Sequence, residues 1–199
     1  MQWVPTLSPL LYLFSPLFRP LFYLSMGLQA AYVISRGLSL GRVPLVGVHD
    51  TLTFLAFSTG LSACFFLSRF REKKAFFKMV ALLAFLISLG ACFSKPMNFP
   101  LPSILKTIWF ELHVVLAFAS YGLFGVGAVL GILAFPGSRA SIVEPYQYKA
   151  ILIGYFLFSL SMIFGGIWAF LAWANYWIWT PKELWTSLVW ILLTLHLHL

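Results

Sequence analysis

The 199-residue chain is 61% hydrophobic, and only 9% of its residues are charged. A soluble domain of this length needs considerably more charge to stay in solution, so the composition excludes an ordinary soluble protein. The net charge of +8 would suggest a nucleic-acid partner in a soluble protein. In a membrane protein, however, basic residues gather in short loops and set the orientation. We therefore expect a membrane protein that binds no nucleic acid.

Six apolar stretches follow one another along the chain, each close to the roughly 20 residues that cross a bilayer as a helix. The first, 10–35, is interrupted by Pro16 and Pro20, which leaves open an interfacial position for its beginning. The other five cover residues 51–67, 76–93, 108–135, 150–172 and 184–199. The sequence thus predicts an all-α, polytopic transmembrane helix bundle of about six spans. We expect one membrane domain over residues 1–199, with the first span within 1–40.

Positive charge is densest in segment 68–74, which reads Ser-Arg-Phe-Arg-Glu-Lys-Lys and is followed closely by another lysine. Such runs remain on the cytoplasmic side, so we place this loop in the cytoplasm. The N-terminus and the loop near Arg139 and Lys149 then also lie inside. Lys95 and Lys106 oppose this orientation weakly, as two charges against five. By alternation, three connections lie outside, at residues 40–50, 94–107 and 173–183.

Tryptophan is concentrated between residues 168 and 190, where six of the eight tryptophans of the chain lie. An aromatic belt at the membrane interface explains one or two tryptophans at a helix end. It explains less well six tryptophans interleaved with polar residues such as Asn175 and Tyr176. Trp173 and Trp177 are four residues apart, so on a helix they would share a face. We expect Trp179 and Pro181 to end that helix.

This arrangement predicts an extracytoplasmic aromatic platform with polar groups at its edge, between the last two spans. Such a surface suits a large, flat, conjugated ligand that bears carboxylates. Stacked rings would cover the faces of the ligand, and indole N–H groups together with Lys182 would bind its carboxylates.

The four histidines differ in their expected positions. His113 begins the span 108–135 at its outer end, level with the tryptophan segment, where a neutral imidazole nitrogen can bind iron as an axial ligand. His198 lies at the inner end of the last span, so it marks at most a second, inner position, and His196 cannot share its helical face. His49 lies in the first outer loop beside Asp50, and we expect it to be an exposed polar residue.

Other chemistry is absent from the sequence pattern. Cys64 and Cys92 are isolated in apolar runs without metal-binding spacing, so we expect them to pack as small hydrophobic residues. No serine-hydrolase, zinc-protease or phosphate-binding motif occurs. The five acidic residues are scattered, which argues against a proton-conducting chain of carboxylates.

Residues 172–183 read Ala-Trp-Ala-Asn-Tyr-Trp-Ile-Trp-Thr-Pro-Lys-Glu and closely resemble the WWD signature of the cytochrome c assembly family, approximately AWGxYWxWDPKE. The preceding run 165–169 is similar to the GAVWA-like lead-in of that family. Trp190 and His198 follow at the family's spacing, and His113 lies where the family has an external histidine. The resemblance extends over residues 41–199 and includes an early outer-loop segment with Gly41, Pro44, Leu45, Leu52 and Phe54. The Pro-Lys-Glu ending favours the CcsA-type, or system II, branch over the CcmC and CcmF branches.

The resemblance implies heme handling. Proteins of this family carry heme b across the membrane as a substrate in transit and present it outside, where the CxxCH thiols of apocytochrome c add to its vinyl groups. By this resemblance, His113 is an external iron ligand and His198 belongs to an inner heme site. The implied heme platform consists of Trp168, Trp173, Tyr176, Trp177, Trp179, Lys182 and Trp185. The chain would be part of a holocytochrome c synthase, a heme lyase that forms thioether bonds. The reacting thiols would belong to the client cytochrome.

The family also implies a membrane partner with an extracytoplasmic domain. Its location would be a bacterial inner membrane or an energy-transducing membrane of an organelle.

Two departures from the family pattern matter. Thr180 stands where the motif has Asp, and Ala174 stands where it has Gly. The family also continues through a further span to a second external histidine, which leads us to expect a fragment of a longer protein or a member of a split or divergent system. These departures support an alternative function, a non-catalytic heme-binding or structural membrane subunit of a larger complex. A small-molecule transporter is a second alternative, against which the lack of paired broken helices and inward charges argues.

Overall fold

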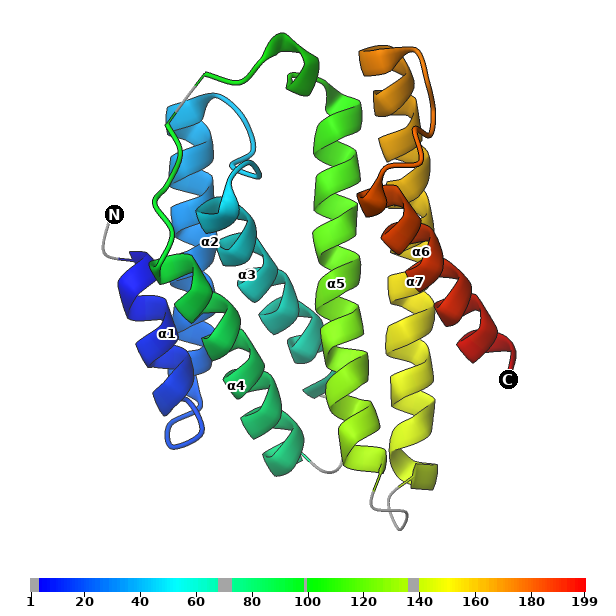
Figure 1. The fold of residues 1–199 in the computed structure, drawn as a ribbon. Helices are drawn as coiled ribbons and strands as arrows, with labels where there is room; N and C mark the ends of the chain where they lie inside the picture. The colour runs from blue at the N-terminus through cyan, green and yellow to red at the C-terminus, as the bar shows by residue number, and fades with distance from the viewer. Residues whose placement is uncertain (1–3, 68–72, 99, 136–139) are drawn as a thin grey trace.

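The computed structural model describes residues 4–67, 73–98, 100–135 and 140–199, and this part of the chain is helical and contains no strand. The chain forms one short 3-10 turn, η1, and a bundle of α-helices (Figure 1). The elements are α1 (Val4–Phe14), α2 (Pro20–Leu40), α3 (Val48–Leu67), α4 (Lys73–Cys92), η1 (Ser103–Leu105), α5 (Ile108–Ala134), α6 (Ala140–Trp173) and α7 (Pro181–His198). The predicted all-α class is therefore confirmed.

Within the described ranges, four helices are long and apolar enough to cross a membrane, which supports an integral membrane protein. They are Val48–Leu67, Lys74–Cys92, Ile108–Ala134 and Ser141–Trp173. These helices match four of the six predicted spans. α2 and α7 reach a comparable length, at 21 and 18 residues, but are less apolar, and α1 has only 11 residues.

The predicted first span, 10–35, is interrupted at Pro16 and Pro20 as the sequence indicates, because the chain turns between Phe14 and Pro20. α1 and α2 form a helical hairpin, and α1 also packs against α4 (Figure 1). Pro16 has no N–H to continue the ladder of α1, and Pro20 occupies the first turn of α2, where that N–H is not needed. At the end of α1, the Tyr12 carbonyl accepts from both the hydroxyl and the backbone N–H of Ser15, at 2.7 and 3.2 Å.

The core lies where α1 to α5 meet the first half of α6 and is filled by buried aromatic and aliphatic side chains, among them Phe22, Phe76, Val80, Val126 and Leu130. α5 and α6 approach each other closely along their length because glycines face the partner helix. A Cβ on Gly127 would lie 2.9 Å from Ile151, and one on Gly154 would lie 2.7 Å from Phe124. Small residues of this kind allow membrane helices to pack tightly.

Among the larger contacts between described helices, α7 packs only against α6. None of the α7 residues is buried. The Trp190 ring stacks on Tyr155 at 5.5 Å, and its indole N–H donates to Ser159 Oγ at 3.0 Å. In Figure 1, α7 descends beside α6 and ends well above the lower end of that helix.

The connections of the bundle lie at its two ends. The links that follow α2, α4 and α6 lie at the upper end in Figure 1, and the ends of α3 and α5 lie at the lower end. The charge-dense segment 68–72 and Arg139 fall outside the described residues. The expected cytoplasmic position of the lower end therefore stays a prediction.

Candidate functional site

A cavity of about 440 Å³ lies at the upper end of the bundle, where α5, α6 and the start of α7 meet the tryptophan segment. Six of the residues that the sequence indicates line it: His113, Trp168, Trp173, Tyr176, Trp177 and Lys182. Met162, Gly165, Ala169, Ile178, Thr180, Glu183 and Thr186 complete the wall. The structure thus brings together residues from three helices, α5, α6 and α7, and from the connection between the last two.

The tryptophan segment leaves the helix earlier than predicted. α6 ends at Trp173, and Ala174 takes a left-handed conformation with φ of 55° while its N–H donates to the Phe170 carbonyl at 2.8 Å. The expected shared helical face of Trp173 and Trp177 is therefore wrong, because the chain has turned before it reaches Trp177. Both side chains nevertheless line the cavity. A left-handed residue at this position is a common way to end a helix, and glycine adopts it most easily.

Thr180 begins α7 as its N-cap. Its hydroxyl accepts from the N–H of Glu183 at 3.5 Å, and the Glu183 carboxylate accepts from the N–H of Thr180 at 2.9 Å, which together form a capping box. The same carboxylate also accepts from the N–H of Ile178 at 3.0 Å. Threonine and aspartate are both good N-caps, so Thr180 retains the capping capacity of the family's Asp but not its charge.

Aromatic contacts stabilise the walls of the cavity. Tyr176 stacks on Phe170 with 4.4 Å between ring centroids and an interplanar angle of 11°. Trp168 meets Trp173 edge-on at 4.9 Å, and its indole N–H donates to the Ile104 carbonyl in η1 at 2.8 Å. Trp168 therefore joins the cavity to the connection between α4 and α5.

His113 lies in the second turn of α5, and its Nδ1 is 2.8 Å from the backbone carbonyl of Ser161 on α6. A carbonyl only accepts, so Nδ1 carries the hydrogen and, in the neutral ring, Nε2 holds the lone pair. Histidines that bind metals commonly donate their other N–H to a carbonyl in this way. The cavity lining also includes one cation, Lys182.

Three of the residues named from the sequence do not line this cavity. Trp179 and Trp185 are each 68% exposed and do not line the cavity. His198 is exposed at the far end of α7, where its Nδ1 is 2.8 Å from the Thr194 carbonyl. The structure therefore keeps His198 apart from His113. The sequence pattern also places His198 at a separate, inner position.

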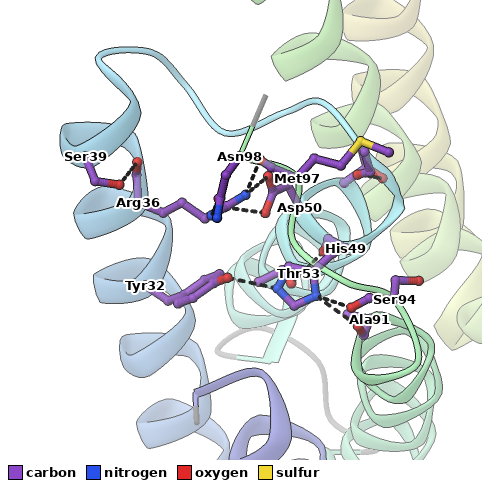
Figure 2. A network of polar contacts seen from close by, with 12 residues as sticks. Tyr32, Arg36, Ser39, His49, Asp50, Thr53, Ala91, Ser94, Met97 and Asn98 are labelled. Carbon is purple, nitrogen blue, oxygen red and sulfur yellow. Dashed lines mark hydrogen bonds and ion pairs between the residues drawn. The ribbon is translucent and has the colours of Figure 1, made fainter. Parts of the chain in front are cut away.

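His49 is buried and not the exposed loop residue that we expected, because the residue is only 3% exposed. Figure 2 shows its ring between Tyr32 and Ala91. α3 begins at Val48, so His49 lies in its first turn and faces both α2 and α4. Its Nε2 lies 2.9 Å from the Tyr32 hydroxyl, and its Nδ1 lies 2.9 Å from the Ala91 carbonyl and 3.0 Å from that of Ser94.

Beside His49, Asp50 pairs with Arg36 of α2 (Figure 2). Arg36 also donates to the Met97 carbonyl at 2.7 Å and to the Asn98 side chain at 3.0 Å. The connection from α4 to α5 is thus held near its start by Arg36 and near its end by Trp168. The sequence signal for this network was an arginine and an aspartate, isolated in apolar surroundings, on either side of one short loop.

Comparison with known proteins places these residues in a family. The family model described as cytochrome C assembly protein matches residues 45–199. Protein NrfI of Wolinella succinogenes is 30% identical over 196 residues, which cover 92% of this chain and 21% of NrfI. Cytochrome c biogenesis protein CcsA of Chlamydomonas reinhardtii is 27% identical, with coverage of 79% of this chain and 50% of CcsA. The CcsA of Prochlorococcus marinus is 26% identical, with coverage of 85% and 66%.

The chain spans about a fifth of NrfI and between half and two thirds of these two CcsA proteins. The matched region contains every residue that lines the cavity described above. Because the family model covers well over half of the chain and the relatives include several CcsA proteins, the chain belongs to the cytochrome c assembly protein family and is of the CcsA type.

Proposed function

We propose that this chain binds heme at the extracytoplasmic end of the bundle and presents it for covalent attachment to apocytochrome c. The observation that carries the proposal is a single cavity that combines aromatic walls, the imidazole of His113 and the ammonium of Lys182. The family to which the chain belongs supports a role in cytochrome c maturation.

The chemistry of the cavity suits heme, which has two apolar faces, a central iron and two propionates. Indole and phenol rings would cover the faces, His113 Nε2 would bind the iron, and Lys182 would pair with a propionate. Trp173 and Tyr176 are 52% and 58% exposed, so a ligand larger than the enclosed volume can extend outward between them. Trp179 and Trp185 would contact only such an extended ligand.

Within this proposal, the residues of the chain hold and orient heme and keep water from one of its faces. They do not supply the reacting sulfur, because Cys64 and Cys92 lie on α3 and α4 and do not line the cavity. Thioether bonds would form with the CxxCH thiols of the client. The chain would then contribute the heme-presenting part of a holocytochrome c synthase, together with a membrane partner that has an extracytoplasmic domain.

His198 would serve as an inner position on the route of heme to the outer cavity. Its place at the far end of α7 from the tryptophan segment supports this assignment. The orientation itself rests on the positive-inside rule applied to segment 68–74.

The binding claim is tested by expressing the membrane-embedded protein with ample heme and measuring heme per protein as the pyridine hemochrome. We expect near-stoichiometric heme in the wild type and a loss of at least tenfold in His113→Ala. His196→Ala is the matched control, because His196 is exposed and lies outside the cavity lining. Wild-type protein that carries no heme, or equal heme in His113→Ala, would overturn the proposal.

A second stage separates presentation from simple binding. The complete maturation system is supplied with an apocytochrome c, and covalent heme in the client is measured by heme staining after denaturing electrophoresis. Heme-loaded wild-type protein that yields no holocytochrome would favour the alternative of a non-catalytic heme-binding subunit. The uncharged Thr180 at the motif's Asp position is the observation that keeps this alternative open.

A further inference from the structure

Two residues of α6 hold the His113 side chain from one side. Ser161 and Gly165 are four residues apart, so they lie on the same face of α6, and both contact His113. Ser161 is only 1% exposed. Its carbonyl accepts from His113 Nδ1 at 2.8 Å, and its hydroxyl donates to the His113 backbone carbonyl at 2.8 Å and lies 3.1 Å from Nδ1. The imidazole and the backbone of His113 are therefore both tied to the same turn of α6.

Gly165 supplies the space that the imidazole occupies. A Cβ at this position would lie 2.6 Å from His113 Nδ1 and 2.9 Å from Cε1, closer than real Cβ atoms approach. Gly165 does not have a positive φ, so the backbone conformation does not require glycine here. Glycine inside a helix is less favourable than alanine. The close approach of the ring is therefore the physical reason for a glycine at this site.

The neighbouring Gly166 shows the contrast. A Cβ on Gly166 would meet its nearest atom, the Tyr176 carbonyl oxygen, at 3.7 Å, which is an ordinary van der Waals contact. Both glycines belong to α6 and to the same short run before Trp168. Of the two, only Gly165 lies so close to His113 that an added Cβ would collide with the imidazole.

We infer that Gly165 and Ser161 are positioning residues that hold His113 with Nδ1 against α6 and leave Nε2 as the nitrogen available to a ligand. This inference rests on the proposed function, because the ligand that Nε2 would bind is the iron of heme. Ser161 determines which ring nitrogen carries the hydrogen, and Gly165 allows the ring to reach Ser161. A donated Nδ1–H also makes the opposite nitrogen a stronger ligand.

The first test compares Gly165→Ala with Gly166→Ala in the membrane-embedded protein. We expect Gly165→Ala to displace the imidazole, to lower bound heme at least tenfold, and to give any residual heme the spectrum of the His113→Ala variant. Gly166→Ala should retain the heme content and spectrum of the wild type. If the wild type binds heme and Gly165→Ala binds it equally with an unchanged spectrum, the inference is overturned while the proposed function stands.

The second test does not depend on heme and uses thermal unfolding of heme-free protein in detergent. In the wild-type background, Gly165→Ala should lower the midpoint, because the new methyl group collides with His113. In the His113→Ala background, the same change should raise the midpoint, because the collision is gone and alanine favours the helix. A shift of the unfolding midpoint in the same direction in both backgrounds, or a double variant that does not fold, would overturn the inference. A wild type that binds no heme would instead remove the proposed function and leave this packing test valid.

Discussion

Arg36 and Asp50 form a two-point ion pair at the upper end of the bundle, with Nε 2.7 Å from Oδ1 and Nη2 3.0 Å from Oδ2. The side chain of Asp50 is 2% exposed and that of Arg36 is 10% exposed. The pair joins α2 to α3, and the further bonds of Arg36 to Met97 and Asn98 add the connection that leads to α5. A charge buried to this extent is tolerated only while its partner is present.

Removal of one partner should therefore be strongly destabilising. We expect Arg36→Ala to lower the free energy of unfolding by about 3–5 kcal/mol, because it leaves the Asp50 carboxylate buried without a counter-charge. Thermal or denaturant unfolding in detergent measures the change. Replacement of both partners, as Arg36→Met with Asp50→Leu, should cost less than Arg36→Ala alone. Ser39→Ala is the control, since the exposed Ser39 hydroxyl donates to the Arg36 carbonyl within its own helix. An Arg36→Ala variant as stable as this control would contradict the prediction.

Ala174 should be a site where glycine stabilises the protein. Its φ of 55° is unfavourable for a residue with a Cβ. We expect Ala174→Gly to raise the free energy of unfolding by up to about 1 kcal/mol, since release of the left-handed strain exceeds the entropy that glycine adds to the unfolded chain.

The matched control for this change is Ala172→Gly, two residues earlier and still inside α6. There the same chemical change should be destabilising by about 1 kcal/mol, because glycine is a poor helix residue. The two variants are compared by their unfolding midpoints in one detergent. A decrease of similar size in the unfolding midpoints of both variants would show that Ala174 is not strained.

Thr180 should be replaceable by aspartate but not by alanine. We expect Thr180→Ala to cost about 1 kcal/mol, because the N-cap acceptor for Glu183 is lost, and Thr180→Asp to stay within a few tenths of the wild type. Hydrogen exchange of the Glu183 amide reports directly on the cap and should be faster only in Thr180→Ala. Thr186→Ala provides the control, because its hydroxyl donates to the Lys182 carbonyl within α7 and is not part of the capping box. Equal exchange in the alanine and aspartate variants would argue against a capping role.

Some expectations from the sequence failed at the ends of helices. The division of the first span depends on how Pro16 and Pro20 act together, and α2 continues to Leu40, five residues beyond the predicted end at residue 35. The end of α6 at Trp173 is set by the turn at Ala174, and neither Pro181 nor the four-residue spacing of Trp173 and Trp177 indicates that turn. His49 was misjudged for a related reason. α3 begins at Val48, three residues before the predicted start at residue 51, so the expected loop residue lies in the first turn of a helix and is buried.

The tryptophan segment and His113 show where sequence and tertiary structure divide. The sequence by itself determined the membrane class, the helical class and the family, because apolar stretches and motif spacing are local properties of the chain. Only the tertiary structure decided that His113 shares a cavity with Lys182, that Gly165 and Ser161 contact the imidazole, and that Arg36 meets Asp50. Contacts of this kind depend on the rotation and separation of packed helices, which are the outcome of many side chains acting together. Hydropathy and spacing along a single helix do not contain that information.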